Sequence, residues 1–125
     1  MIVKNIKILS QNVRKNLLII NTLLETQTQF NIILIQEPPW SEIRKVSSSS
    51  NNEGDSFMGT CHHPNWITFA RSLSDRSDSP RVISYLNICL SSLCFLFHKD
   101  IINHRDISLI SFFNNNIYYY IIVIR

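Results

Sequence analysis

Two short hydrophobic segments near the start of the chain each end in polar residues, and the stretch between them has the pattern of a helix. The first segment covers residues 6–12 and closes on a glutamine and Asn12, and the second covers residues 31–39 and closes on a glutamine, Glu37 and two prolines. Leucine and isoleucine recur at helical spacing over residues 14–30. A strand–helix–strand unit joins parallel strands, whose carboxyl ends lie at the same edge of a sheet. The pattern therefore predicts an α/β fold with Asn12 and Glu37 close together at that edge.

The rest of the chain reads as strand patterns separated by polar segments. Together with the opening unit, strands are expected over residues 3–10, 32–35, 66–70, 82–86, 93–97, 107–113 and 117–124. The run of asparagines at residues 114–116 predicts a tight turn between the last two strands. Residues 41–64 and 72–80 are expected to be irregular loops. A length of 125 residues suits one domain, in which a βαβ unit leads into mainly antiparallel strands.

Composition limits the classes of protein to which the chain can belong. Hydrophobic residues make up 45% of it, which is enough for a substantial core, and a net charge of +3 is too small to indicate a nucleic-acid surface by itself. Three cysteines argue against a disulfide framework and for a reducing compartment. The longest mostly apolar stretch, residues 83–97, is shorter than the roughly 20 residues that span a bilayer. We expect a soluble, intracellular protein with no membrane partner, whose amino terminus is a strand and not a signal peptide.

The two strand ends carry oxygen ligands that suit a divalent metal ion. Adjacent strands lie about 4.8 Å apart, so the side chains of Asn12 and Glu37 could converge on one ion. Magnesium prefers hard oxygen ligands, one or two carboxylates, and water or phosphate oxygens in its remaining positions. Each residue also has a simpler interpretation, because Asn12 could cap the following helix and Glu37 could be a solvated loop carboxylate. The residue types alone leave these alternatives open.

Other polar and aromatic residues are weaker candidates for function. Arg14 and Lys15 could contact a phosphate backbone and Trp40 could stack on a base, although solvated faces and core packing are the commoner roles. Two charged clusters, at residues 98–100 and 104–106, could act as acid–base groups, but a solvated loop explains them equally well. Half of a zinc site can be read in residues 61–63 with Cys89 or Cys94 as completion, and buried apolar cysteines are the simpler interpretation.

Two ordered motifs resemble the start of a known superfamily. Residues 9–13 (LSQNV) followed by residues 33–38 (ILIQEP) are similar to the opening of the endonuclease/exonuclease/phosphatase superfamily. The similarity is greatest to the apurinic-type endonuclease domains that begin non-LTR (LINE-like) retrotransposon polyproteins. Similar segments further along are HPNW at residues 63–66, PRVISY at 80–85 and RDISLIS at 105–111. The resemblance spans the chain but corresponds to about the first half of the family domain.

The resemblance implies a fold, a chemistry and two roles. It implies that residues 1–125 are the N-terminal part of a four-layer α/β sandwich that hydrolyses phosphodiesters in DNA with Mg²⁺ or Mn²⁺. Asn12 and Glu37 would be the ligands of a single metal ion. The nucleus is the compartment in which a parent acting on chromosomal DNA would work.

The printed sequence lacks the later motifs of the family. It has no Asp-x-Asn pair, no final Asp-His pair and no tyrosine after the strand at residues 117–124. We therefore expect a fragment that is inactive alone. The alternative is a non-catalytic remnant, or a module that binds nucleic acid or another partner without enzymatic activity.

Overall fold

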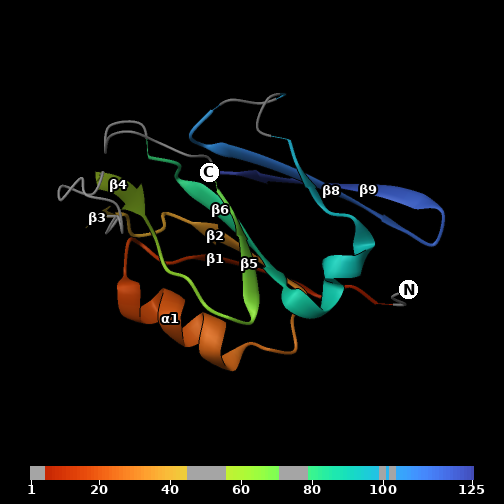
Figure 1. The fold of residues 1–125 in the computed structure, drawn as a ribbon, viewed down its shortest axis with the longest axis horizontal. Helices are drawn as coiled ribbons and strands as arrows, with labels where there is room; N and C mark the ends of the chain where they lie inside the picture. Colours follow the sequence, from red (N-terminus) through yellow and green to blue (C-terminus); the bar gives the residue numbers. More distant parts are fainter. Residues whose placement is uncertain (1–4, 45–55, 71–78, 99–100, 102–103) are drawn as a thin grey trace, which may run out of the picture.

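The computed structural model describes residues 5–44, 56–70, 79–98, 101 and 104–125, which form a mixed α/β fold (Figure 1). The first half contains β1 (Ile8–Asn12), α1 (Leu17–Thr26), β2 (Ile32–Gln36), β3 (Ser41–Arg44), β4 (Ser56–Gly59) and β5 (Trp66–Phe69). The second half contains β6 (Val82–Asn87), the 3₁₀-helix η2 (Ile88–Leu93), β7 (Leu96–Phe97), β8 (Ile107–Asn114) and β9 (Ile117–Ile124).

The predicted βαβ unit is confirmed, and it sets the register of the main sheet. Strand β1 runs parallel to β2, with Ile8 opposite Ile32 and Asn12 opposite Gln36. Strand β6 pairs antiparallel with β2, and β5 pairs antiparallel with β6, which gives the order β1-β2-β6-β5. We call this four-stranded sheet sheet A. Strands β1 and β2 therefore end side by side.

Helix α1 is shorter than the expected 14–30, and its first turn differs from the sequence interpretation. The side chain of Asn16, not Asn12, caps the helix by accepting a hydrogen bond of 3.1 Å from the Ile19 N–H. Arg14 and Lys15 have positive φ angles of 50° and 60° and form a tight turn before the cap. The helix ends at Thr26, so residues 27–30 lie outside it.

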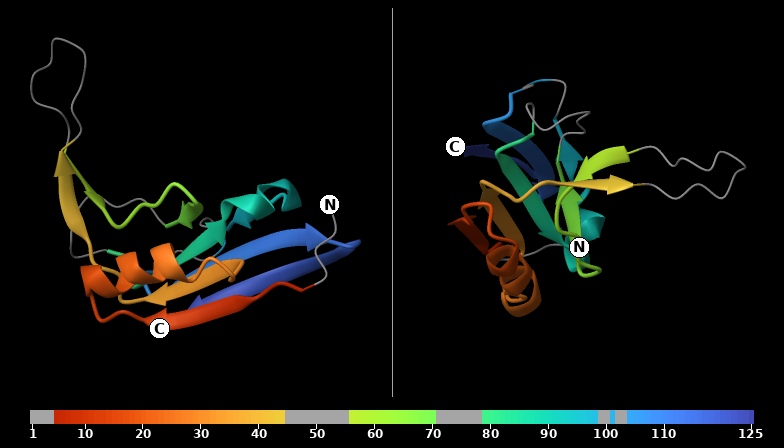
Figure 2. Two further views of the ribbon diagram at one scale, coloured as in Figure 1. Left: turned by 90° about the horizontal axis from the view of Figure 1, so that it is seen from below. Right: turned by 90° about the vertical axis from the view of Figure 1, so that its left-hand side faces the viewer.

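Helix α1 lies on one face of sheet A and strands β8 and β9 lie on the other (Figure 2), and there is a hydrophobic core on each face. Ile33 and Ile35 of β2 pack with buried residues of α1, whereas Ile32 and Leu34 point to the opposite face. Successive side chains of a strand alternate between faces, so an unbroken aliphatic run is buried on both sides. The second face is covered by a three-stranded sheet of order β7-β8-β9, which we call sheet C. Sheet A thus lies between a helix and a second sheet.

The hairpin of sheet C confirms the predicted asparagine turn. Asn114 pairs with Ile117, and the two intervening residues have positive φ angles, 53° for Asn115 and 61° for Asn116. Two successive residues with positive φ are typical of a type I′ turn, whose twist suits two-residue hairpins. Most side chains of β9 are exposed, namely those of residues 117–120 and of Ile122 and Ile124.

Several predicted boundaries are corrected by the structure. The strand expected over residues 93–97 is shortened to the two-residue β7, because η2 extends to Leu93. The Asn87 side chain caps η2 by accepting a hydrogen bond from the Cys89 N–H. The segment 41–64, expected to be irregular, contains the antiparallel pair β3 and β4. The first strand begins at Ile8 and continues to Asn12. Most of the expected loop at 72–80 lies outside the described residues. No helix in the part of the chain described here is long and apolar enough to cross a membrane.

Candidate functional site: the strand-end edge of sheet A

The parallel register brings Asn12 and Glu37 to one place, as the sequence predicted. Asn12 is the last residue of β1 and lies opposite Gln36, so Glu37 is the next residue on the neighbouring strand. The backbone N–H of Glu37 donates to the Arg81 carbonyl oxygen at 2.8 Å, and the Glu37 carbonyl accepts from the Lys15 N–H at 2.7 Å. Glu37 is therefore held from both sides, by the turn after β1 and by the residue that precedes β6.

Glu37 adopts an unusual backbone conformation. Its φ angle is 53°, in the left-handed region, and Pro38 follows it. A residue with a Cβ atom loses about 1–2 kcal/mol in this region, and such conformations persist where the surrounding structure over-determines them. The two backbone hydrogen bonds of Glu37 provide that determination. Strained positions of this kind cluster at functional sites, which makes the conformation of Glu37 an observation independent of its motif.

The amide of Asn12 connects the two strand ends. Its Oδ1 atom accepts the backbone N–H of Arg14 at 2.9 Å. The Asn12 side chain also lowers the pKa of the Glu37 carboxyl by hydrogen bonding. The amide oxygen is thus engaged with the turn.

A guanidinium group already forms an ion pair with the Glu37 carboxylate. Arg125 Nη2 lies 2.6 Å from Glu37 Oε1. Hydrogen bonds from Arg125 and then Asn12 hold the pKa of the Glu37 carboxyl below its ordinary value, and the charge of Lys15 acts in the same direction. The same contact raises the pKa of Arg125. The guanidinium is therefore a cation at the position where the sequence predicts a metal ion.

Arg125 is anchored by the strands around it. The Gln36 side chain donates to the Ile124 carbonyl oxygen at 3.1 Å, and the Arg125 N–H donates to the Asp106 carbonyl oxygen at 2.9 Å. Asp106 in turn accepts two hydrogen bonds from the Arg81 guanidinium, through Nε and Nη2. This bidentate pair holds the pKa of the Asp106 carboxyl below its ordinary value. The end of β9 is thus connected to the site through the backbone of Ile124 and Arg125 and through the side chain of Arg125.

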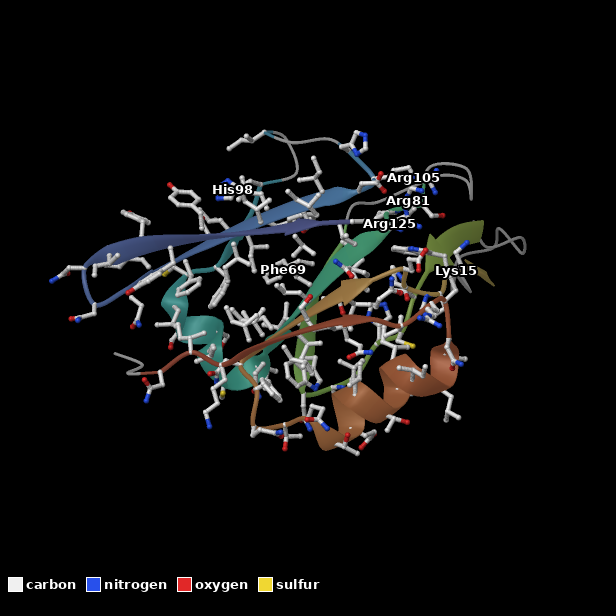
Figure 3. All side chains as sticks on the ribbon, turned by 180° about the vertical axis from the view of Figure 1, so that it is seen from behind. Lys15, Phe69, Arg81, His98, Arg105 and Arg125 are labelled. Carbon is white, nitrogen blue, oxygen red and sulfur yellow. The ribbon has the colours of Figure 1, made fainter. Side chains whose placement is uncertain are left out.

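A pocket of about 200 Å³ opens beside Glu37. It is lined by Lys15, Glu37, Pro38, Trp40, Ser79, Pro80, Arg81 and Arg105. Figure 3 shows Lys15, Arg81, Arg105 and Arg125 gathered at the same end of the molecule. The site combines one carboxylate with an excess of cationic groups, so it can attract an anion as well as a metal ion.

The weaker sequence candidates separate in the structure. Lys15 and Trp40 both line the pocket, whereas Arg14 lies exposed in the turn and is not among the lining residues. Trp40 packs against the core and donates from Nε1 to the Pro80 carbonyl oxygen at 2.7 Å. Asp106 belongs to the ion pair with Arg81, and the charged cluster at 98–100 lies partly outside the described residues.

In the described ranges, no arrangement of side chains supports the hypothesis of a zinc site. Cys61 is a buried free thiol, Cys89 and Cys94 are exposed free thiols, and His63 Nε2 lies 3.0 Å from Glu25 Oε1. Across the residues that the structure describes, no three histidine, cysteine, aspartate or glutamate side chains are grouped as a metal site. The metal prediction therefore depends on Asn12 and Glu37.

Sequence reasoning missed Arg125 and the Arg81–Asp106 pair. Arg125 follows an apolar strand and is separated from Glu37 by 88 positions, so no local pattern connects them. In the sequence, Arg81 belongs to the similar segment PRVISY, and Asp106 belongs to the segment RDISLIS and to the charged cluster at residues 104–106. An arginine just before a predicted strand gives no indication of its partner without the fold.

Comparisons with family models, with curated proteins and with solved structures found no match to this chain. The resemblance described above therefore depends on the motifs around Asn12 and Glu37 and on the site that these residues form.

Proposed function

We propose that this chain is the N-terminal part of a retroelement-type endonuclease/exonuclease/phosphatase domain, a Mg²⁺-dependent phosphodiesterase that acts on DNA. The observation that carries the proposal is the contact between Asn12 and Glu37 at the shared end of two parallel strands. Further support comes from the layers, because a helix on one face of sheet A and a second sheet on the other suit part of a four-layer α/β sandwich.

The donor set fits half of a site for a hard divalent ion. Glu37 would supply a carboxylate and Asn12 an amide oxygen, which leaves positions for water or phosphate oxygens. A bound Mg²⁺ or Mn²⁺ would neutralise charge on a phosphodiester. The chain's own contribution is to hold the two oxygens at one edge through the βαβ register. A metal ion at Glu37 must compete with the Arg125 guanidinium for the carboxylate, so we expect metal binding to be weak.

The same chain is proposed to be inactive by itself. The Asp-x-Asn and Asp-His motifs that orient the nucleophile and support the scissile phosphate in the family are not in the printed sequence. Loss of groups that position a reaction typically costs orders of magnitude in rate. The second candidate is a non-catalytic module that binds nucleic acid or another partner. The observation that favours it is the Glu37 carboxylate, which is already paired with Arg125.

A titration with Mn²⁺ tests the metal site. Free Mn²⁺ is followed by its electron paramagnetic resonance signal, in the wild-type chain and in Glu37→Gln, which keeps the size of the side chain and removes its charge. Glu25→Gln is the matched control, because Glu25 is an exposed carboxylate on α1. Weaker Mn²⁺ binding in Glu37→Gln alone is expected. Equal binding in all three proteins would remove the metal assignment.

A nicking assay tests the proposal that the chain is inactive by itself. Supercoiled plasmid is incubated with the 125-residue chain and Mg²⁺, with Glu37→Gln as the reference. We expect no nicking above the buffer blank. Nicking by the wild type that Glu37→Gln abolishes would establish nuclease activity and would show that the missing motifs are dispensable.

A further inference from the structure

We propose that the pocket lined by Lys15, Arg81 and Arg105 binds a phosphoryl oxyanion of a nucleic-acid backbone, beside the metal position and without a metal ion. The name of the ligand, a nucleic-acid phosphate, rests on the proposed function. The anion site itself rests on the charges and contacts of the pocket.

The positive charges at this end of the molecule exceed the negative ones. Lys15, Arg81 and Arg105 line the pocket, and Arg125 lies at its Glu37 side. Within the described ranges, the carboxylates paired with these four cations are Glu37 and Asp106, and each is engaged by one arginine. Two cationic groups therefore remain without a carboxylate partner among those residues.

These two groups are Lys15 and Arg105. Lys15 is exposed, and its backbone N–H donates to the backbone carbonyl oxygen of Glu37. Its ammonium group makes no salt bridge with any described carboxylate. Arg105 Nε donates to the backbone carbonyl of Ser79 at 3.3 Å, which orients the guanidinium but does not neutralise it. The remaining N–H groups of a guanidinium form a planar fork, which suits phosphate oxygens.

The donors are held in place by backbone contacts between three segments. Lys15 lies in the turn closed by the Asn16 N–H and the Val13 carbonyl oxygen at 2.8 Å. The Arg81 N–H donates to the Arg105 carbonyl oxygen at 2.6 Å, so the residues before β6 and before β8 are joined directly. Asp106 fixes the Arg81 guanidinium at two atoms. The pocket is thus organised before an anion arrives, which lowers the entropy lost on binding.

The size of the pocket suits a phosphate group. A volume of about 200 Å³ is several times the roughly 30 Å³ share of one water molecule, so an oxyanion and some of its hydration fit together. Two prolines and Trp40 form less polar walls, and charge–charge interactions are stronger beside such walls than in open water.

Binding of DNA in the presence of EDTA tests the proposal independently of the metal site. A fluorescein-labelled 12-base-pair duplex is titrated with the 125-residue chain, and anisotropy is recorded at several salt concentrations. The variants are Lys15→Met and Arg105→Gln. Lys7→Met is the matched control, because Lys7 is an exposed lysine just before the opposite end of β1. Thermal unfolding of each variant establishes that it is folded.

We expect each pocket variant to weaken binding several-fold and the control to leave it unchanged. The slope of log Kd against log salt should fall by about 0.9 for each lost phosphate contact. Lys15→Arg, which keeps the charge, should restore binding. Equal weakening by Lys7→Met and Lys15→Met, or no weakening by either pocket variant, would overturn the proposal.

Two further arms identify the ligand and separate this site from the metal site. Inorganic phosphate should displace the duplex at an ionic strength at which acetate does not. Displacement by both anions alike would show that the pocket does not select phosphate, and phosphate binding without duplex binding would overturn the nucleic-acid assignment. Glu37→Gln should bind the duplex at least as tightly as the wild type, because it removes a negative charge and releases Arg125. Loss of Mn²⁺ binding with retained duplex binding in Glu37→Gln is the combination that both proposals predict.

Discussion

The Arg125 guanidinium donates a hydrogen bond of 2.6 Å to the Glu37 carboxylate across 88 positions of sequence. The contact links the two sheets at the strand-end edge, because the arginine follows β9 of sheet C and the glutamate follows β2 of sheet A. A cation that approaches Glu37 must therefore compete with an internal one.

Removal of the internal cation should strengthen metal binding. In Arg125→Met, the Glu37 carboxylate loses its competing partner, so we expect Mn²⁺ to bind a few-fold more tightly than to the wild type. The measurement is the same Mn²⁺ titration by electron paramagnetic resonance. Arg14→Met is the control, because Arg14 is exposed and forms no ion pair within the described part of the chain. Equal or weaker binding by Arg125→Met would show that the arginine and the metal ion do not share the carboxylate.

The two ion pairs should make stability depend on pH in the acid range. Glu37 and Asp106 both have pKa values below their ordinary 4.5 and 3.8, chiefly because of hydrogen bonds from Arg125 and Arg81. Between the lowered and the ordinary values the unfolded chain binds more protons, so the free energy of unfolding rises with pH. The stabilisation should be fully present above about pH 5 and should be lost as the pH falls through the lowered values.

Urea unfolding between pH 2.5 and pH 7 measures this dependence. The double variant Glu37→Gln and Asp106→Asn should show a flatter profile than the wild type. A parallel pair of profiles would mean that other carboxyl groups cause the acid sensitivity.

The helix cap should be worth a measurable part of the stability. Asn16→Ala removes the acceptor of the Ile19 N–H and should lower the free energy of unfolding by about 1 kcal/mol. Asn21→Ala is the control, since Asn21 is exposed within α1 and alanine favours the helix there. Urea unfolding at pH 7 gives both values. A loss in Asn21→Ala that equals the loss in Asn16→Ala would argue against the cap.

The turn between β8 and β9 should select its residues by backbone conformation. Asn116 has a φ angle of 61°, which glycine adopts freely and a β-branched residue adopts at a loss of roughly 1–2 kcal/mol or more. Asn116→Gly should therefore keep or slightly raise the melting temperature, and Asn116→Val should lower it. Similar melting temperatures for both variants would indicate that the turn has another conformation in solution.

The parts of the fold that sequence predicts are those with a local cause. The β1–α1–β2 unit follows from aliphatic runs and helical spacing, because covering both faces of β2 requires an unbroken apolar run. The start of α1 was misplaced because Asn12 and Asn16 are both good caps, and only the tight turn at Arg14 and Lys15 decides between them.

The remaining features depend on contacts that are distant in sequence. Residues 93–97 have a strand pattern, yet Asn87 caps a 3₁₀-helix ahead of them and Cys94 turns the chain with a φ angle of 53°. At the site, the proximity of Asn12 and Glu37 was predictable from parallel pairing. The approach of Arg125 depends on how sheet C lies on sheet A, and no periodicity reports that arrangement.

The left-handed backbone of Glu37 places two requirements on a single position. For the chain conformation alone, glycine or asparagine would be the easier occupant, and either would relieve the distortion. The side chain that is present provides instead the only carboxylate lining this pocket among the described residues. Replacement by either residue would relieve the backbone but would lose the ion pair with Arg125, whereas selection that demands a charged ligand here should retain the glutamate. The residue retained at position 37 therefore indicates whether selection acts on the pocket.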